Sequence, residues 1–290
     1  MKFYVSWHPA CHGGTDPPYW NWFNPDGILI ALSNLAGSSL KKAMAIGLHA
    51  YTGYTGDIFL DGGAFGYPGH LSPYSQSQML SIQTWLKCDR FSHLDRRFEK
   101  NMFTSDAERW SALECTIENA KVAARWERAH KDVGTLVYVV QGWDVHSVSL
   151  CAKKISKFNA RDYALGSLIG VPPGEIARRV QEVRRIIGTS PRLHLFGISS
   201  VGILRGLVGF VDSFDSSAPI KAAFFKEVIT GPGERAHVDS LFSNDCDCPV
   251  CRSNSRLVAL KGTPGLARKL NHLRAVHNAF VMTEYAHELL

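Results

Sequence analysis

The 290-residue sequence lacks the segments that would place a protein in a membrane or send it across one. It contains no run of about 18 consecutive apolar residues, so it predicts no membrane-spanning helix. The N-terminal residues MKFYVSWHP contain neither the charged segment nor the long apolar segment of a secretory signal peptide. We therefore expect a soluble, intracellular protein of the cytoplasm.

Two glycine-rich motifs for nucleotide cofactors are also missing. The turn after the first expected strand has no G-x-G-x-x-G, and no G-x-x-x-x-G-K-[ST] occurs. Because such loops bring backbone N–H groups to phosphates, their absence disfavours a nucleotide-cofactor enzyme. Internal repeats and low-complexity segments are absent too. With 45% hydrophobic residues, the sequence predicts a single domain over residues 1–290.

Charge and cysteine content narrow the class further. The formal net charge is +6, which permits a polyanionic partner without requiring one. The seven cysteines are an odd number, and in an intracellular chain this argues for reduced thiols rather than for disulfides.

Three of these cysteines have the spacing of metal ligands. Cys246, Cys248 and Cys251 form C-x-C-x-x-C, and His277 follows 26 positions later. Three thiolates and one imidazole complete a tetrahedral structural zinc site and leave no open position for catalysis. We expect Zn²⁺ to join an irregular insertion to a C-terminal helix over residues 266–290. Both would lie in a zinc-binding subdomain spanning residues 222–280.

The rest of the chain alternates between short apolar runs and longer helical patterns. Expected strands span residues 3–7, 58–60, 136–141, 164–168, 194–197 and 210–213. Helical periodicity spans residues 106–130 and 172–187. This alternation indicates parallel βαβ units, which a Rossmann sheet and a (β/α)₈ barrel both satisfy. The missing dinucleotide motif favours the α/β class with a (β/α)₈ TIM barrel and a zinc-binding insertion near the C-terminus.

In such a barrel the active site lies at the C-terminal ends of the strands. That rule selects Asp61, Asp95, Gln141, Gly166, Ser167, Gly197 and Asp215. Taken alone, each of these residues could instead have a structural role; an aspartate in a glycine-rich turn, for example, is common turn chemistry.

Ordered motifs surround these positions. They are L-D-G-G-A-F at 60–65, V-Q-G at 140–142, Y-A-L-G-S-L at 163–168, L-F-G at 195–197 and V-D-S-F-D-S-S-A-P at 211–219. Together with the zinc pattern, they resemble the guanine transglycosylases, the tRNA-guanine transglycosylase-like enzymes that exchange a guanine in nucleic acid for a 7-deazaguanine base. The resemblance runs from about residue 55 to 280.

The resemblance implies that Asp215 is the nucleophile and that Asp61 is the general acid/base. A carboxylate suits displacement at a glycosidic carbon, because an anion stabilises the oxocarbenium character and can capture the sugar. A second carboxyl group can protonate the departing purine and deprotonate the incoming one. The reaction would leave the sugar-phosphate chain intact.

The resemblance also implies a pocket for the base. Its implied members are Phe65, Asp95, Gln141, Gly166, Ser167, Leu168, Phe196 and Gly197. Asp95 would accept the N–H groups of the guanidine-like edge, although the local sequence D-R-F-S-H-L-D at 89–95 departs from the D-E-C ending of the family. Gln141 and the backbone of 166–168 would read the carbonyl edge. Phe65 and Phe196 would sandwich the ring.

Other departures favour DNA over tRNA as the polymer. Gly66 replaces a glutamine of the tRNA-modifying members, and Ile220-Lys221 replaces a Thr-Arg pair, so Lys221 is the remaining candidate for a nucleic-acid contact. Pro172 stands near the place of a missing Gly-Glu. The chain is also short for a tRNA-modifying enzyme. It most resembles the DNA-modifying branch found in bacteriophages and genomic islands, which would have to extrude guanine from the duplex.

Alternatives remain at this stage. The first is a tRNA-guanine transglycosylase of the queuosine or archaeosine type. More distant ones are a non-catalytic, zinc-stapled nucleic-acid-binding protein and a glycoside hydrolase that uses Asp61 and Asp215 as its acid and nucleophile. Membrane partners are not expected. The sequence leaves open a homodimer or an accessory protein, and the identity of the 7-deazaguanine.

Overall fold

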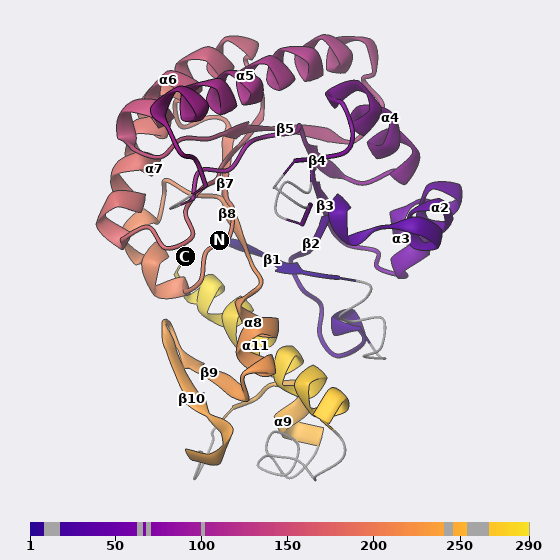
Figure 1. Cartoon of the computed structure of the whole chain (residues 1–290). Coiled ribbons are helices and arrows are strands. Elements are labelled where there is room, and N and C mark those ends of the chain that lie inside the picture. The colour runs from indigo at the N-terminus through magenta and orange to yellow at the C-terminus, as the bar shows by residue number, and fades with distance from the viewer. Residues whose placement is uncertain are drawn as a thin grey trace.

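The chain forms a closed barrel of parallel strands. The computed structural model describes residues 1–8, 18–62, 66–67, 71–99, 102–240, 246–253 and 267–289. The strands follow one another in sequence order around the barrel (Figure 1). They are β1 (Lys2–Ser6), β2 (Gly27–Ala31), β3 (Asp57–Asp61), β4 (Arg90–Ser92), β5 (Thr135–Val140), β6 (Asp162–Leu165), β7 (Arg192–Leu195) and β8 (Ser213–Ser216). Pairing of β1 with β8 closes the barrel and sets Tyr4 beside Asp215.

Helices surround this barrel, as Figure 1 shows. They are α2 (Gly37–Ile46), α3 (Leu48–Thr52), α4 (Gln76–Leu86), α5 (Asp106–Ala129), α6 (Val145–Ile155) and α7 (Pro173–Ile187). Local chemistry fixes several starts. Ser105 accepts from the backbone N–H of Glu108 at the start of α5, and Asp144 forms a capping box with Ser147 at the start of α6. Proline at the first turn of α7 needs no intrahelical partner for its nitrogen.

The predicted fold class is confirmed, with differences in detail. The helices expected over 106–130, 172–187 and 266–290 are α5, α7 and α11 (Ala267–Glu288). The strand expected at 210–213 instead spans Ser213–Ser216, because the 3-10 helix η5 (Val201–Leu207) and a turn with Gly209 at φ 82° occupy the preceding residues. Asp215 therefore lies within β8 rather than after it. Strands β2 and β4 were not predicted.

Alternation along the strands divides the core into two parts. Inside the barrel, Tyr4, Leu29, Phe59, Val137 and Ala164 form one buried cluster, and the remaining apolar side chains pack between strands and helices. Such layers make the barrel interior a packed core rather than a pore.

Charged residues close the amino-terminal end of the barrel. Arg90 Nε lies 3.1 Å from Asp57 Oδ2, and its Nη1 lies 3.0 Å from Asp162 Oδ1. Arg192 and the Tyr4 hydroxyl complete the network through Asp162 and Asp57. With this end filled, an opening to solvent is left to the opposite, carboxyl-terminal end.

After β8 the chain leaves the barrel, and its last helix packs back against it. Helix α8 (Ala218–Phe224) leads to a hairpin of β9 (Glu227–Gly231) and β10 (Glu234–His237), then to α9 (Pro249–Ser253) and the long α11 (Figure 1). Asn278 on α11 is fully buried and bonds Pro219 O, Glu227 O and Ile229 N. This amide ties α11 to both α8 and the hairpin. In the described ranges, no helix is long and apolar enough to cross a membrane.

Candidate active site

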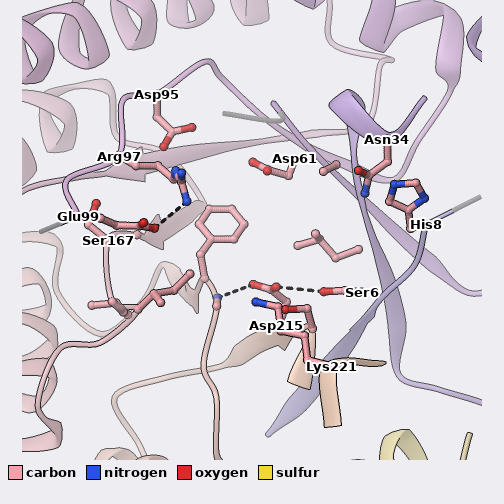
Figure 2. A pocket seen from close by; sticks show the side chains of 18 of the residues that line it. Ser6, His8, Asn34, Asp61, Asp95, Arg97, Glu99, Ser167, Asp215 and Lys221 are labelled. Carbon is pink, nitrogen blue, oxygen red and sulfur yellow. Dashed lines mark hydrogen bonds and ion pairs between the residues drawn. The ribbon is translucent and has the colours of Figure 1, made fainter. Parts of the chain in front are cut away.

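A cavity of about 370 Å³ opens at the carboxyl-terminal ends of the strands. This is the size of a small-molecule site and the place where barrel enzymes bind substrate. Its lining includes the predicted site residues Asp61, Asp95, Gln141, Gly166, Ser167, Leu168, Phe196, Gly197, Asp215 and Lys221 (Figure 2). Phe65, predicted as half of an aromatic sandwich, lies outside the described residues. The fold thus brings distant motifs into one cavity.

Asp215 lies at the floor of this cavity and is held by several groups. Its Oδ1 accepts from the Gly197 backbone N–H at 3.0 Å and faces His194 Nε2 at 3.3 Å. Its Oδ2 accepts from the Ser6 hydroxyl at 3.4 Å. Gly197 adopts φ 71°, a left-handed conformation that glycine reaches without strain. The carboxylate is therefore oriented by β1, β7 and the turn after β7.

Asp61, the last residue of β3, is oriented from the neighbouring strand. The Ser92 hydroxyl of β4 donates to Asp61 Oδ1 at 3.1 Å, while the backbone N–H of Gly62 donates to that hydroxyl at 2.9 Å. Figure 2 shows Asp61 and Asp215 pointing into the cavity from different sides. Two carboxyl groups at one cavity can act on a single bound molecule, one as the nucleophile and the other as the acid or base.

A third wall carries a buried chain of hydrogen bonds. Gln141 Nε2 donates to Asp95 Oδ2 at 2.5 Å, the Ser167 hydroxyl donates to Gln141 Oε1 at 2.5 Å, and the Phe98 N–H donates to that hydroxyl at 2.8 Å. Burial raises the pKa of the Asp95 carboxyl to about 6, although the Gln141 hydrogen bond and the nearby Arg97 act in the opposite direction. Asp95 therefore changes charge near neutrality.

The turn after β6 explains two neighbouring positions. A Cβ on Gly166 would lie 2.3 Å from Gln141 Nε2, so glycine makes room for the Gln141 side chain. The Gly166 N–H donates to Val140 O at 3.1 Å, so this backbone donor is already engaged. Ser167 adopts φ 57°, a conformation that costs a side-chain-bearing residue about 1 kcal/mol. Its two hydroxyl hydrogen bonds offset that cost.

Phe196 provides an aromatic surface in the cavity. Its ring packs against Phe59, with centroids 5.6 Å apart, and edge-on against His194 at 4.9 Å. Because Phe59 belongs to the buried barrel interior, the Phe196 ring is supported from below and remains partly exposed. A flat ligand can stack on such a ring.

Sequence reasoning missed several residues of this region. Ser6, Asn34, Arg97 and Glu99 line the cavity, and His194 contacts Asp215 from outside the lining. Arg97 Nη1 lies 2.6 Å from Glu99 Oε1. Asn34 follows β2, and because the sequence did not predict β2, Asn34 was not among the expected strand-end residues. His194 shares its strand face with Phe196, two residues on, and this alternation was the available signal.

The predicted zinc ligands also converge. Cys246, Cys248, Cys251 and His277 place their ligand atoms within 4.8 Å of one another. The three sulfurs lie 3.5, 3.4 and 3.6 Å from His277 Nδ1. Tetrahedral zinc bonds of usual length would separate sulfur from nitrogen by about 3.5 Å, so this donor set fits the ion. His277 Nε2 lies 3.2 Å from Ile229 O, the partner that orients a metal-binding imidazole.

Comparison with known proteins agrees with this arrangement. The sequence pattern of the family described as queuine tRNA-ribosyltransferase matches residues 30–289. A tRNA-guanine(15) transglycosylase of Methanosphaera stadtmanae is 31% identical over 73% of this chain and 31% of its own length. Queuine tRNA-ribosyltransferases of Thermoanaerobacter pseudethanolicus and Thermoanaerobacter sp. are 27% and 24% identical, over 59% and 88% of this chain and 48% and 77% of their own lengths.

The first two relatives are thus matched over less than half of their lengths. The family match itself covers most of this chain, including both facing carboxylates and the Cys₃His cluster. From that extent, and from the barrel that carries these groups, the chain belongs to the queuine tRNA-ribosyltransferase family, the guanine transglycosylases.

Proposed function

We propose that this protein replaces guanine in DNA with a 7-deazaguanine base through a covalent aspartyl-glycosyl intermediate. The observation that carries the proposal is the single cavity in which Asp61 and Asp215 face the buried Asp95–Gln141–Ser167 wall. Nucleophile, acid/base and base-reading groups are the parts that a base exchange requires.

In the first half-reaction, an Asp215 oxygen attacks C1′ of the target nucleotide. The bond between C1′ and N9 breaks, and its electron pair passes to the departing guanine, which takes a proton from Asp61. The sugar is left joined to Asp215 as an ester, and the phosphodiester chain stays whole. The orientation of Asp215 by Gly197 and Ser6 serves this step by holding the carboxylate in place for attack.

In the second half-reaction, the incoming base occupies the place that guanine left. Asp61, now ionised, removes the proton from the ring nitrogen, and that nitrogen attacks C1′ while the ester bond breaks. The electron pair returns to the Asp215 carboxylate, so both carboxyl groups regain their starting states. One pocket serves both bases because a 7-deazaguanine keeps the hydrogen-bonding edge of guanine.

That shared edge is matched by the polar wall of the cavity. An ionised Asp95 accepts from the N–H groups of the guanidine-like edge, and Gln141 with the Ser167 and Leu168 backbone donates to the carbonyl oxygen. Phe196 offers the flat face on which the ring stacks.

The Cys₃His cluster holds Zn²⁺ in a structural role. A bound zinc ion supplies folding free energy, because the four ligands come from segments that it joins. In this proposal the ion links α9 to α11, and Asn278 next to the ligand His277 then fastens α11 to α8. Lys221 of α8 lies at the cavity, so the metal supports the rim of the active site.

A polymer substrate is supported by the surface that continues from this rim. Ile220 and Lys221 line the cavity, and Phe224 and Phe225, one turn further on, are 69% and 66% exposed. A cation followed by exposed rings suits a phosphate and the nucleotides that flank a target base. The net charge of +6 also favours a polyanion.

DNA is preferred over tRNA because the residues associated with anticodon-loop recognition are changed. Ile220-Lys221 stands where the tRNA-modifying members have Thr-Arg, and a lysine lacks the planar fork of arginine. The named relatives favour the second candidate, a tRNA-guanine transglycosylase. A non-catalytic, zinc-stapled nucleic-acid-binding protein is disfavoured, because binding a polyanion needs no carboxylates at the site. A glycoside hydrolase is disfavoured, because it needs no polar wall that reads a purine.

The test is base exchange with radiolabelled guanine, followed by a 7-deazaguanine chase, using duplex DNA, single-stranded DNA and bulk tRNA in parallel. The proposal expects label to enter DNA and to be displaced by the 7-deazaguanine. Label that enters tRNA but never DNA would select the second candidate. No incorporation into any polymer by a zinc-loaded, folded protein would favour a binding function.

A further inference from the structure

His194 contacts Asp215 but is not one of the described residues that line the cavity. Its side chain is buried, with 4% of the residue exposed. His194 pairs with Ser213 across β7 and β8, so its ring lies beside the two inward-facing side chains Ser213 and Asp215. Nδ1 is 2.9 Å from Ser213 Oγ, and Nε2 is 3.3 Å from Asp215 Oδ1.

The chemistry of these partners assigns the protons. An ionised carboxylate only accepts hydrogen bonds, so Nε2 must carry a hydrogen. In a neutral ring Nδ1 is then an acceptor, and the Ser213 hydroxyl must donate to it. In a protonated ring Nδ1 donates to the same oxygen. Nε2–H points at Asp215 in either case, and Ser213 acts as an adaptable partner.

Among the residues that the structure describes, aromatic rings surround the rest of the imidazole, and no further hydrogen-bond partner of it is found. The Tyr4, Phe59 and Phe196 rings have centroids 5.6, 5.0 and 4.9 Å from that of His194, at steep angles. The Tyr4 hydroxyl is directed to Asp57 at 2.7 Å. An aromatic box of this kind fixes the plane of the imidazole and so the direction of its Nε2–H bond.

Asp215 consequently has two different oxygens. Oδ1 accepts from Gly197 N–H and His194 Nε2–H, whereas Oδ2 receives only the longer Ser6 contact among the described residues. Two donors on one oxygen draw charge to it and set the carboxylate plane. The other oxygen is the more available for forming a bond.

We propose that His194 is a positioning residue that holds Oδ1 of Asp215, so that Oδ2 is the oxygen that attacks C1′. This inference rests on the proposed function, in which Asp215 is the nucleophile. His194 touches neither base nor sugar; it acts through Asp215 and, by the same hydrogen bond, stabilises the carboxylate each time the ester breaks.

Two substitutions separate positioning from packing. His194→Phe keeps a ring of similar volume and removes the donor. His194→Gln keeps an N–H donor within reach of Oδ1. Tyr4→Phe is the matched control, because it removes a buried polar group from the same aromatic box without touching Asp215.

We expect His194→Phe to lower kcat of base exchange about 10- to 100-fold, the effect of losing a hydrogen bond to a charged group. KM for both substrates should stay within about twofold, His194→Gln should regain most of kcat, and Tyr4→Phe should match the wild type. Equal kcat in His194→Phe and wild type, or equal losses in His194→Phe and His194→Gln, would overturn the proposal.

A second measurement needs neither a folded variant nor base exchange by the wild type. Nitrogen-15 NMR of the His194 ring in the zinc-loaded wild-type chain reports which nitrogen carries hydrogen. The proposal requires a protonated Nε2, and a ring protonated only at Nδ1 would refute it. A protonated Nε2 in a protein that exchanges no base would leave the hydrogen bond standing while the proposed function fails.

Discussion

At the scale of single residues, two aspartates three positions apart have separate roles in the structure. Asp212 Oδ2 accepts from Arg184 at 2.6 Å and from the Leu193 backbone N–H at 2.7 Å, which makes it a connection between α7, β7 and β8. Asp215 lines the cavity instead. The sequence motif contains both acids, and the family resemblance selects Asp215. The structure adds that Asp212 is engaged in fixing β7 to α7.

This pair gives the first prediction. Asp215→Asn should reduce base exchange below detection while zinc content and the thermal unfolding midpoint stay near those of the wild type, because an amide is no nucleophile at C1′. Asp212→Asn is the matched control. It should retain exchange per folded molecule and lower the unfolding midpoint, since it weakens a partly buried ion pair. An active Asp215→Asn variant would contradict the assignment.

The second prediction concerns pH and Asp95. Its pKa of about 6 means that the carboxyl is ionised at pH 8 and mostly neutral at pH 5. Because only the ionised form accepts both N–H groups of the base edge, KM for guanine should rise about tenfold per pH unit below pH 6. Steady-state kinetics between pH 5 and 8 check this. Asp95→Asn should bind the base weakly and lose that pH dependence; an unchanged acid limb would refute the role.

At the scale of elements, the turn after β6 shows how a functional loop departs from local preference. Ser167 carries a side chain at φ 57°, a left-handed conformation that glycine would adopt without strain. The hydroxyl then binds both Gln141 and the loop that contains Phe98. The turn therefore couples Gln141 to the segment that follows β4.

A pair of variants tests this account of the turn. Ser167→Ala keeps the unfavourable φ and loses the hydrogen bonds, whereas Ser167→Gly loses the hydrogen bonds but relieves the backbone. We expect Ser167→Gly to be more stable than Ser167→Ala by about 1 kcal/mol, with both less stable than the wild type. Urea unfolding measures the order. A more stable alanine variant would show that the backbone at this position is unstrained.

Elements also differ in how well the sequence predicts them. β5 was predicted because TLVYVV is a run of β-branched and aromatic residues, and α7 because of its proline start. β4 has only three residues, Arg90–Ser92, and two of them are polar, so it gives no apolar run. Its position is fixed by pairing with β3 and β5, which is tertiary information. The same holds for the three-residue shift of β8.

At the scale of the whole molecule, motifs spread over about 150 residues meet in one cavity because a parallel barrel brings all strand ends to one edge. That rule let the sequence predict the polar lining at the strand ends, from Asp61 on β3 to Asp215 on β8. It could not supply Ser6, Arg97 or His194, since these depend on strand register and loop path. It also could not show that the glycine at position 166 is required by the close approach of the Gln141 side chain.

The metal gives a prediction at this scale. Cys248→Ser should lose bound zinc and lower the thermal unfolding midpoint by several degrees, because a zinc ion on this cluster would join α9 to α11, and α11 packs on the barrel. Cys115→Ser, at an exposed thiol outside the cluster, should change neither quantity. Metal analysis and calorimetry check both variants. A zinc-free Cys248→Ser protein of wild-type stability would show that the cluster does not support the fold.

The central claim is that Asp215 carries the sugar of a DNA strand during exchange. The most direct measurement is acid-quenched incubation of the protein with end-labelled duplex DNA, followed by denaturing electrophoresis and peptide mapping of any protein–DNA adduct. The account predicts an adduct on the peptide that contains Asp215, absent from Asp215→Asn and discharged by added 7-deazaguanine. Base exchange into DNA with the adduct on another residue, or undiminished in Asp215→Asn, would contradict it.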